Sequence, residues 1–160
     1  MKELLVRTAT GVTLVVLFAG SILLGPFSMT LMMVLIYLLG SRELLRAGSS
    51  SRILPYSLQI LAGLMLILAS FGIVKGELHA LWLLAPPLLW LAGHLVKGGR
   101  KSLLTFFWLA LPLSAFLGLA GFNGEGYSSL FPLSVIAMVW ISDTFSYLCG
   151  RLLGRHPFTP

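Results

Sequence analysis

The residues best suited to chemistry lie near the C-terminal end of the sequence. Asp143 is the only aspartate among 160 residues, and it follows a strongly apolar stretch. Ser146 and Tyr147 come three and four residues later, which on an α-helix places all three side chains on one face. An ionisable group inside an apolar span costs roughly 3 kcal/mol, so it normally faces protein or water. We therefore expect Asp143 at the mouth of a buried functional site.

Two glycine–arginine pairs, Gly150-Arg151 and Gly154-Arg155, extend this pattern, and both glycines share the helical face of Asp143. Each residue type also has a purely structural explanation. The acid could form an ion pair or a buried hydrogen bond. The arginines could anchor the helix end at a membrane surface, and the glycines could form a close helix-packing seam. The spacing alone leaves these alternatives open.

The composition indicates what kind of fold must position these residues. The chain is 58% hydrophobic and only 10% charged, and its mean hydropathy is +0.97. Soluble domains carry about 25% charged residues. This chain has too little polar material to cover a globule in water, so lipid must be its solvent. We expect an all-α, polytopic integral membrane protein in which residues 1–160 form a single transmembrane domain.

Charged residues and turn formers divide the chain into about six transmembrane helices. Residues 8–41 carry no charge and would form about 50 Å of helix, too long for one crossing of a hydrocarbon core ~30 Å thick. Gly25-Pro26 is expected to divide this stretch into two spans. Further spans are expected over residues 53–74, 78–96, 103–121 and 130–153. Pro86-Pro87 is expected to bend or locally unwind the fourth span.

The distribution of cations predicts the orientation. Lys and Arg number eleven against five Asp and Glu, a formal net charge of +6. With the N-terminus inside, ten of the eleven cations fall in inner segments and only Lys75 falls outside. The positive-inside rule therefore predicts that both termini are cytoplasmic. The charge excess is expected to meet anionic lipid and nucleotide phosphates rather than nucleic acid. Asp143 then lies about 12 Å of helix inward from Arg151.

The pattern over residues 140–155 resembles a motif of the integral-membrane phosphatidate cytidylyltransferases, also called CDP-diacylglycerol synthases. Their motif has the form W-x-x-D-[ST]-x-[AS]-Y-x-x-G-[RK]-x-x-G-[RK]. The matching residues are Trp140, Asp143, Thr144, Ser146, Tyr147, Gly150, Arg151, Gly154 and Arg155. Phe145 stands where many members have a small residue. In that family a loop containing I-S-P-K-K-T-x-E-G follows, and the present sequence ends at Pro160, where the loop would begin. We therefore expect the N-terminal part of a longer architecture, without the C-terminal catalytic signature.

The resemblance implies transfer of CMP from CTP to phosphatidic acid, which gives CDP-diacylglycerol and pyrophosphate. Asp143 is then a catalytic residue and a ligand of Mg²⁺, because carboxylates hold the hard divalent cations that nucleotidyl transfer requires. Tyr147 is expected to orient that carboxylate. Arg151, Arg155 and Ser146 are expected to bind substrate phosphates. Neither G-x-x-x-x-G-K-[ST] nor G-x-G-x-x-G occurs in the sequence, so phosphate binding must use cations and metal.

The same resemblance implies a setting in phospholipid biosynthesis. The expected partners are CTP, phosphatidic acid and membrane lipids, with a homodimer as the assembly. The expected location is the bacterial inner membrane, with the active face toward the cytoplasm. An alternative from another class is a small membrane transporter or scaffold that uses Asp143 for ion coupling. Transporters usually show paired broken helices or an inverted repeat, and neither is evident in this sequence.

Overall fold

The computed structural model describes residues 2–46, 53–95 and 105–153, and within these ranges the regular structure is entirely helical. The elements in chain order are α1 (Lys2–Leu23), α2 (Pro26–Arg46), α3 (Ile53–Val74), the 3₁₀-helix η1 (Ala80–Leu84), α4 (Ala85–Leu95), the π-helix η2 (Thr105–Ala110), α6 (Leu111–Leu119) and α7 (Leu130–Leu153). The all-α prediction is confirmed for this part of the chain.

The break between α1 and α2 lies where the sequence predicts it. Gly25 has a φ of 119°, a backbone conformation that glycine adopts without a steric penalty. Pro26 is the first residue of α2, a position where its fixed φ suits the helix and its missing N–H leaves no hydrogen bond unmade. Two residues are therefore enough to end one helix and begin the next in a new direction.

The fourth and fifth predicted spans differ from simple α-helices. Residues Ala80–Leu84 form a 3₁₀-helix, and Pro86 and Pro87 then occupy the first turn of α4. The two prolines therefore begin an α-helix instead of bending the middle of one, because the first turn is where a missing N–H is tolerated. Pro112 has the same place at the start of α6, directly after the π-helical segment Thr105–Ala110. By contrast, α3 and α7 have the predicted bounds.

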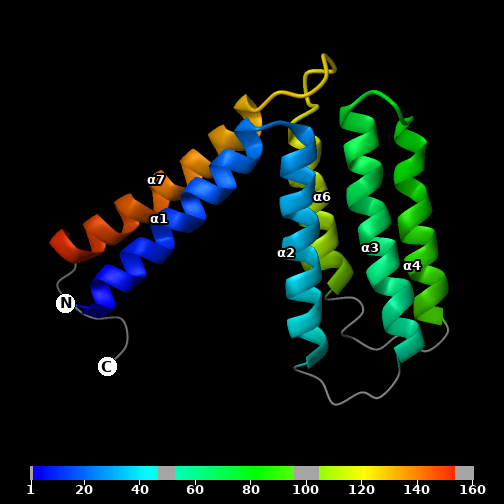
Figure 1. The fold of residues 1–160 in the computed structure, drawn as a ribbon, viewed down its shortest axis with the longest axis horizontal. Helices are drawn as coiled ribbons and strands as arrows, with labels where there is room; N and C mark the ends of the chain where they lie inside the picture. Colours follow the sequence, from blue (N-terminus) through cyan, green and yellow to red (C-terminus); the bar gives the residue numbers. More distant parts are fainter. Residues whose placement is uncertain (1, 47–52, 96–104, 154–160) are drawn as a thin grey trace.

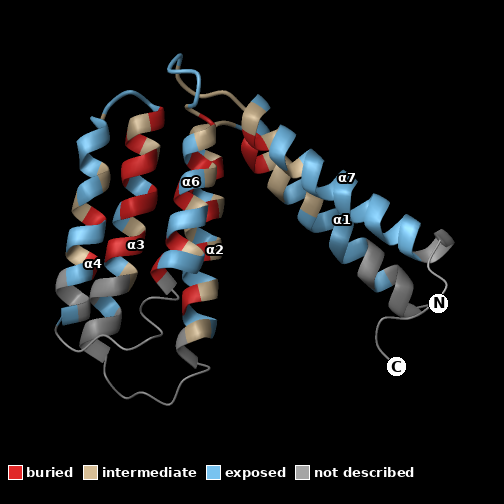
Figure 2. Cartoon of the chain, turned by 180° about the vertical axis from the view of Figure 1, so that it is seen from behind, coloured by how far each residue is buried: buried red, intermediate tan, exposed pale blue. Residues whose placement is uncertain are grey.

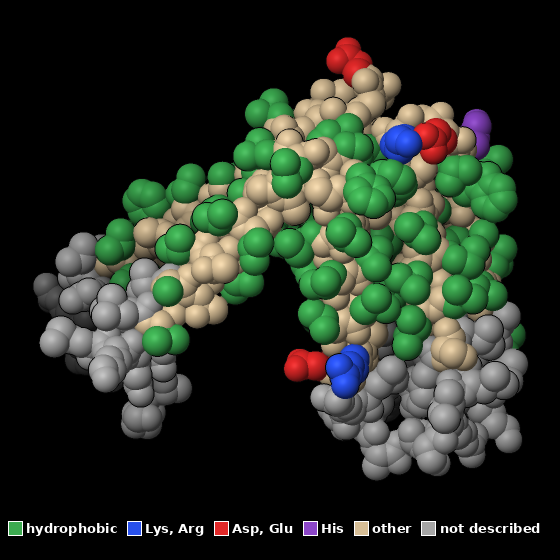
Figure 3. Space-filling view, in the orientation of Figure 1, with side chains coloured by type: hydrophobic (Ala, Val, Ile, Leu, Met, Phe, Trp, Pro, Cys, Tyr) green, Lys and Arg blue, Asp and Glu red, His purple; other side chains and the backbone are tan. Residues whose placement is uncertain are grey.

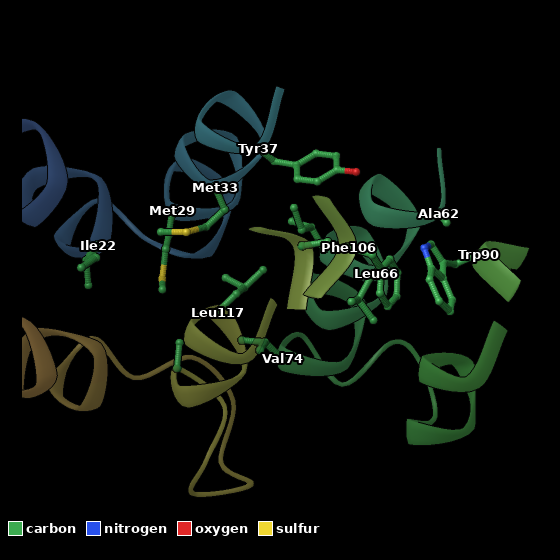
Figure 4. Close-up of a cluster of buried hydrophobic side chains, with 13 residues drawn as sticks. Ile22, Met29, Met33, Tyr37, Ala62, Leu66, Val74, Trp90, Phe106 and Leu117 are labelled. Carbon is green, nitrogen blue, oxygen red and sulfur yellow. The ribbon is translucent and has the colours of Figure 1, made fainter. Parts of the chain in front are cut away.

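Two groups of helices are visible in Figure 1. Helices α2, α3, α4 and α6 stand side by side as a bundle, and α1 and α7 lie against each other as an arm that diverges from it. A cluster of thirteen buried hydrophobic residues extends through the bundle to the base of the arm; Figure 4 shows part of it, including Tyr37, Leu66, Trp90, Phe106 and Leu117. In Figure 2 the buried residues lie mainly in the bundle, whereas α7 is exposed along most of its length.

The loop before α7 fastens the base of the arm. The Tyr127 hydroxyl donates a hydrogen bond to the backbone carbonyl of Ile22 (2.5 Å), near the end of α1, and also contacts the Met29 sulfur (3.6 Å). The Ser28 hydroxyl donates to the carbonyl of Ser21 (2.6 Å), across the turn between α1 and α2. The arm is thus tied to the bundle at its base, and its two helices run out together to the chain ends (Figure 1).

Hydrophobic side chains cover much of the surface between two charged ends. In Figure 3, Lys, Arg, Asp and Glu side chains lie at two opposite ends of the molecule, with hydrophobic side chains between them. Within the described ranges, the helical segments Pro26–Leu44 and Leu130–Gly150 are long and apolar enough to cross a membrane, and four further apolar helical segments are shorter. The charged side chains that Figure 3 shows are therefore separated into two sets by an apolar belt, and Asp143 lies apart from both, within the apolar segment of α7.

Candidate functional site

Helix α7 positions the predicted site residues. It is continuous from Leu130 to Leu153, so Asp143, Ser146, Tyr147 and Gly150 share one helical face, as the spacing predicts. Arg151 belongs to the last turn of the same helix, and its side chain is outside the described part. Arg155 and Gly154 lie outside the described residues altogether. The structure therefore brings the acid, both hydroxyls and the first glycine together on one face.

This face is not covered by the rest of the described chain. Every residue from Ile141 to Gly150 is exposed, and Tyr147 has 65% of its surface accessible. Among the described side chains, none forms a hydrogen bond or ion pair with Asp143, Ser146 or Tyr147. The expectation that Asp143 lies in a buried site is thus not met here, and the Tyr147 hydroxyl does not hold its carboxylate. The single described chain presents these groups on an open surface.

One hydroxyl of the motif, that of Thr144, has its hydrogen-bond partner within α7. The Thr144 hydroxyl donates a hydrogen bond to the Trp140 carbonyl one turn earlier, at 2.7 Å. Such a bond satisfies the hydroxyl without involving another element. Thr144 therefore has a local role in α7, whereas Asp143, Ser146 and Tyr147 keep their polar atoms available.

The donor set around Asp143 limits how it could hold a metal ion. No group of three or more His, Cys, Asp or Glu side chains is found in the described part of the chain, so Asp143 contributes a single carboxylate. Mg²⁺ commonly keeps several waters and is bound through one or two carboxylates together with substrate phosphates. One exposed carboxylate fits a metal ion that arrives with a triphosphate, and does not form a complete protein cage.

The site face continues into an apolar groove that the sequence analysis did not identify. A cavity of about 550 Å³ lies between the arm and α2; it is lined by Gly11, Leu14, Val15 and Phe18 of α1, Ile36 of α2, and Ile136 and Trp140 of α7. Asp143 follows Ile136 by seven residues and Tyr147 follows Trp140 by seven. Seven residues complete two helical turns to within about 20°. The groove wall and the polar face are therefore one side of α7.

A signal for this groove was present in the sequence. Trp140 is the first residue of the motif, and Gly11, Leu14, Val15 and Phe18 recur at intervals of three, four and seven residues. These intervals place the four residues on one face of α1. The sequence does not reveal that α1 and α7 would lie together, since their separation along the chain exceeds one hundred residues.

A second cavity, of about 380 Å³, lies within the bundle between α3, α4, η2 and α6. Ser70 and Ser114 line it, but their hydroxyls donate to backbone carbonyls of their own helices, at 3.0 Å to Leu66 and 2.9 Å to Leu111. Its other described lining residues are apolar, and none of them belongs to α7. This cavity is therefore separate from the candidate site and offers no free donor for a polar substrate.

Comparison with known proteins identifies the family of the chain. The sequence model of the cytidylyltransferase family matches residues 5–160, nearly the whole chain. No similar protein of curated function and no similar solved structure is found. Because the match covers well over half of the sequence, the chain belongs to the cytidylyltransferase family, and the resemblance carried by residues 140–155 is confirmed at the level of the family. This membership indicates a nucleotidyltransferase that uses CTP.

Proposed function

We propose that this member of the cytidylyltransferase family transfers CMP from CTP to phosphatidic acid, giving CDP-diacylglycerol and pyrophosphate. The observation that carries the proposal is the exposed face of α7, on which Asp143, Ser146 and Tyr147 lie within one turn of one another. This face continues an apolar groove at one end and reaches Arg151 at the other. A lipid acceptor and a charged nucleotide require such a junction of apolar and polar surface.

The proposed setting is a membrane crossed by six helical segments, with both termini on the cytoplasmic side. Successive described helices run in alternating directions between the two ends of the molecule (Figure 1). The end that holds the start of α1 and the ends of α2 and α7 is also the end to which the sequence assigns ten of eleven cations. The positive-inside rule makes that end cytoplasmic, where CTP is available. Membrane insertion also accounts for the many exposed hydrophobic side chains.

The proposed reaction is a substitution at phosphorus. A phosphate oxygen of phosphatidic acid bonds to the α-phosphorus of CTP, and the bond from that phosphorus to the β-phosphate oxygen breaks, releasing pyrophosphate. Asp143 would hold Mg²⁺, which supplies neutralisation of triphosphate charge when bound. Tyr147 and Ser146 can donate hydrogen bonds to phosphate oxygens from the same face. Arg151, at the helix end, has the guanidinium group suited to paired phosphate oxygens.

The test is Asp143→Asn in the complete protein, assayed for CTP-dependent formation of CDP-diacylglycerol in membranes or nanodiscs. The amide keeps the size of the carboxylate but removes its charge, so we expect product formation to fall to background. Glu125→Gln is the matched control, because Glu125 is an exposed acid in the loop between α6 and α7, at the opposite end of α7 from Asp143 (Figure 1). It should leave product formation unchanged. Near-normal product formation by Asp143→Asn would refute the metal role of Asp143.

The transporter alternative predicts a different pattern of results. Proteoliposomes containing the wild-type protein would then show ion-linked uptake that Asp143→Asn abolishes, with no response to CTP. Absence of CDP-diacylglycerol formation by the wild-type protein, under conditions in which CTP binds, would overturn the proposed acceptor.

A further inference from the structure

We infer that the groove between the arm and α2 binds one acyl chain of an anionic glycerophospholipid, with the head group directed toward the far end of the arm. The inference rests on the proposed function only in naming phosphatidic acid as the lipid. It adds a subsite, formed by α1, α2 and α7, for the part of the substrate that does not react.

The lining of the groove is almost entirely apolar. Its seven described residues are all glycine, aliphatic or aromatic, and its volume is about 550 Å³. The α1 wall from Gly11 to Phe18 is roughly 10 Å long. A Cβ added at Gly11 would meet no atom within 4 Å, so the wall is open on the groove side. A largely apolar space, in which the Trp140 indole N–H is the one polar side-chain group of the described lining, suits a hydrocarbon chain better than a nucleotide.

Along the arm, the surface changes from apolar at the groove to polar toward the chain ends. Two turns beyond Ile136 and Trp140, the same side of α7 carries Asp143 and Tyr147, and the helix then reaches Arg151. On α1, Arg7 occupies the position two turns before Leu14, which lines the groove. The start of α1 and the end of α7 lie next to each other at the far end of the arm (Figure 1). Positions of both charge signs, Glu3 and Arg7 on α1 and Asp143 and Arg151 on α7, thus lie beyond the apolar part.

An apolar groove followed by a polar face matches a phospholipid, which has an apolar acyl chain followed by a polar head group. An acyl chain would occupy the groove, the ester and glycerol region would follow along α7, and the phosphate would reach the hydroxyls of Ser146 and Tyr147. A protein helix in the same groove would need an apolar stripe along its full length, and the polar end would leave that stripe facing charges. The gradient therefore favours a lipid over a second copy of the chain.

The experiment uses phosphatidic acid with a photoreactive diazirine midway along one acyl chain, bound to the complete protein in nanodiscs without CTP. After irradiation, labelled positions are mapped by mass spectrometry. We expect label concentrated on Phe18, Ile36 and Trp140, with less on exposed positions outside the groove, such as Leu31. Unlabelled phosphatidic acid should compete for this label, and phosphatidylcholine should compete weakly.

Two adjacent valines provide a matched pair of variants. Val15 lines the groove, whereas Val16 has 62% of its surface exposed and does not line it. Val15→Trp should fill the groove and lower the label there several-fold, whereas Val16→Trp should leave the label unchanged. Gly11→Leu is a second filling variant that a Cβ clash does not obstruct. Thermal melting of each variant shows whether it folds.

Three results would overturn the inference: equal labelling of groove and exposed positions, crosslinks to a second copy through the groove residues, or unchanged labelling in both filling variants. Because labelling needs no CTP, it is separable from the proposed reaction. Concentrated label without CDP-diacylglycerol formation would refute the reaction and keep the lipid groove. Product formation with evenly spread label would refute the groove and keep the reaction.

Discussion

The bundle and the arm are built from similar apolar helices but bury them very differently. In the bundle, residues such as Tyr37, Ile67 and Leu117 have no accessible surface. In α7, Pro132 near its start is buried, whereas no residue from 133 to 150 is buried, although this stretch is mostly apolar (Figure 2). Both regions are therefore built from apolar helices, but the arm packs against the described chain only near its base, whereas the bundle packs along its length.

This difference in burial bears on which residue types each region can carry. A face buried within the chain is restricted by the shapes of its neighbours, because protein interiors are close-packed. A face that no neighbour covers can carry an acid, hydroxyls and glycines at one-turn intervals, as α7 does from Asp143 to Gly150. The bundle thus forms the closely packed part of the described chain, and the arm carries the predicted site residues next to the groove.

The same truncation in both regions is the strongest test of this contrast. Leu117 in α6 is fully buried, whereas Leu148 in α7 is 43% exposed. Leu117→Ala should lower the free energy of unfolding by about 2–5 kcal/mol, since it leaves a cavity among fixed neighbours. Leu148→Ala should change the free energy by at most about 0.5 kcal/mol. Denaturant unfolding in mild detergent measures both, and equal losses would show that α7 is packed in the folded protein.

A smaller effect is expected from overfilling the bundle. Gly63 of α3 faces the Tyr37 side chain of α2 so closely that an added Cβ would overlap the ring and hydroxyl. Gly63→Ala should therefore destabilise the protein by about 1–3 kcal/mol, as other overpacked cores do. Gly118→Ala is the control, because its Cβ would meet nothing within 4 Å. It should be neutral or stabilising by up to about 1 kcal/mol, the ordinary helix preference for alanine.

A double-mutant cycle identifies the cause of that loss. In a Tyr37→Leu background the ring is gone, so Gly63→Ala should cost less than it does in the wild type. An unchanged cost in both backgrounds would contradict the proposed contact between Tyr37 and Gly63.

The helical segments could be predicted from the sequence because their signals are local. Gly25-Pro26 fixes one boundary by backbone geometry, and the uncharged run between Arg52 and Lys75 gives the bounds of α3. The start of α7 follows the turn-rich segment 122–129. The 3₁₀ and π segments were not predicted, because both depend on how Pro86-Pro87 and Pro112 are accommodated against neighbouring helices. A proline restricts its own turn, but tertiary packing decides whether a helix bends there or begins.

The sequence predicts which residues belong to the candidate site, but it does not predict where in the fold that site lies or what lies next to it. Periodicity puts Asp143, Ser146 and Tyr147 on one face, which α7 confirms. The groove depends on contacts between α1 and α7, which are far apart in sequence, and helical periodicity carries no information about such pairs. The roles of these residues in metal and phosphate binding stay predictions.

The least disruptive prediction concerns the base of the arm, where the Tyr127 hydroxyl is one of two hydroxyls that tie the arm to the rest of the chain. Tyr127→Phe removes the hydrogen bond to the Ile22 carbonyl and should cost about 1 kcal/mol. The bundle core is untouched, so the arm alone should gain freedom. Spin labels at Phe145 and Leu88, with Cys149 replaced, should report a broader distribution of distances between arm and bundle in the variant. An unchanged distribution would mean that the bond does not restrain the arm.

Alkaline pH offers a test of the same bond without mutation. Burial raises the pKa of Tyr127 above its ordinary value of 10.0, because the neutral phenol is favoured where water is partly excluded. The folded state then holds the proton more tightly than the unfolded state. The stabilisation is fully present below pH 10 and is lost as the pH rises through the higher folded pKa. The wild-type distance distribution should therefore broaden toward that of Tyr127→Phe only at strongly alkaline pH, whereas the phenylalanine variant should show no such transition.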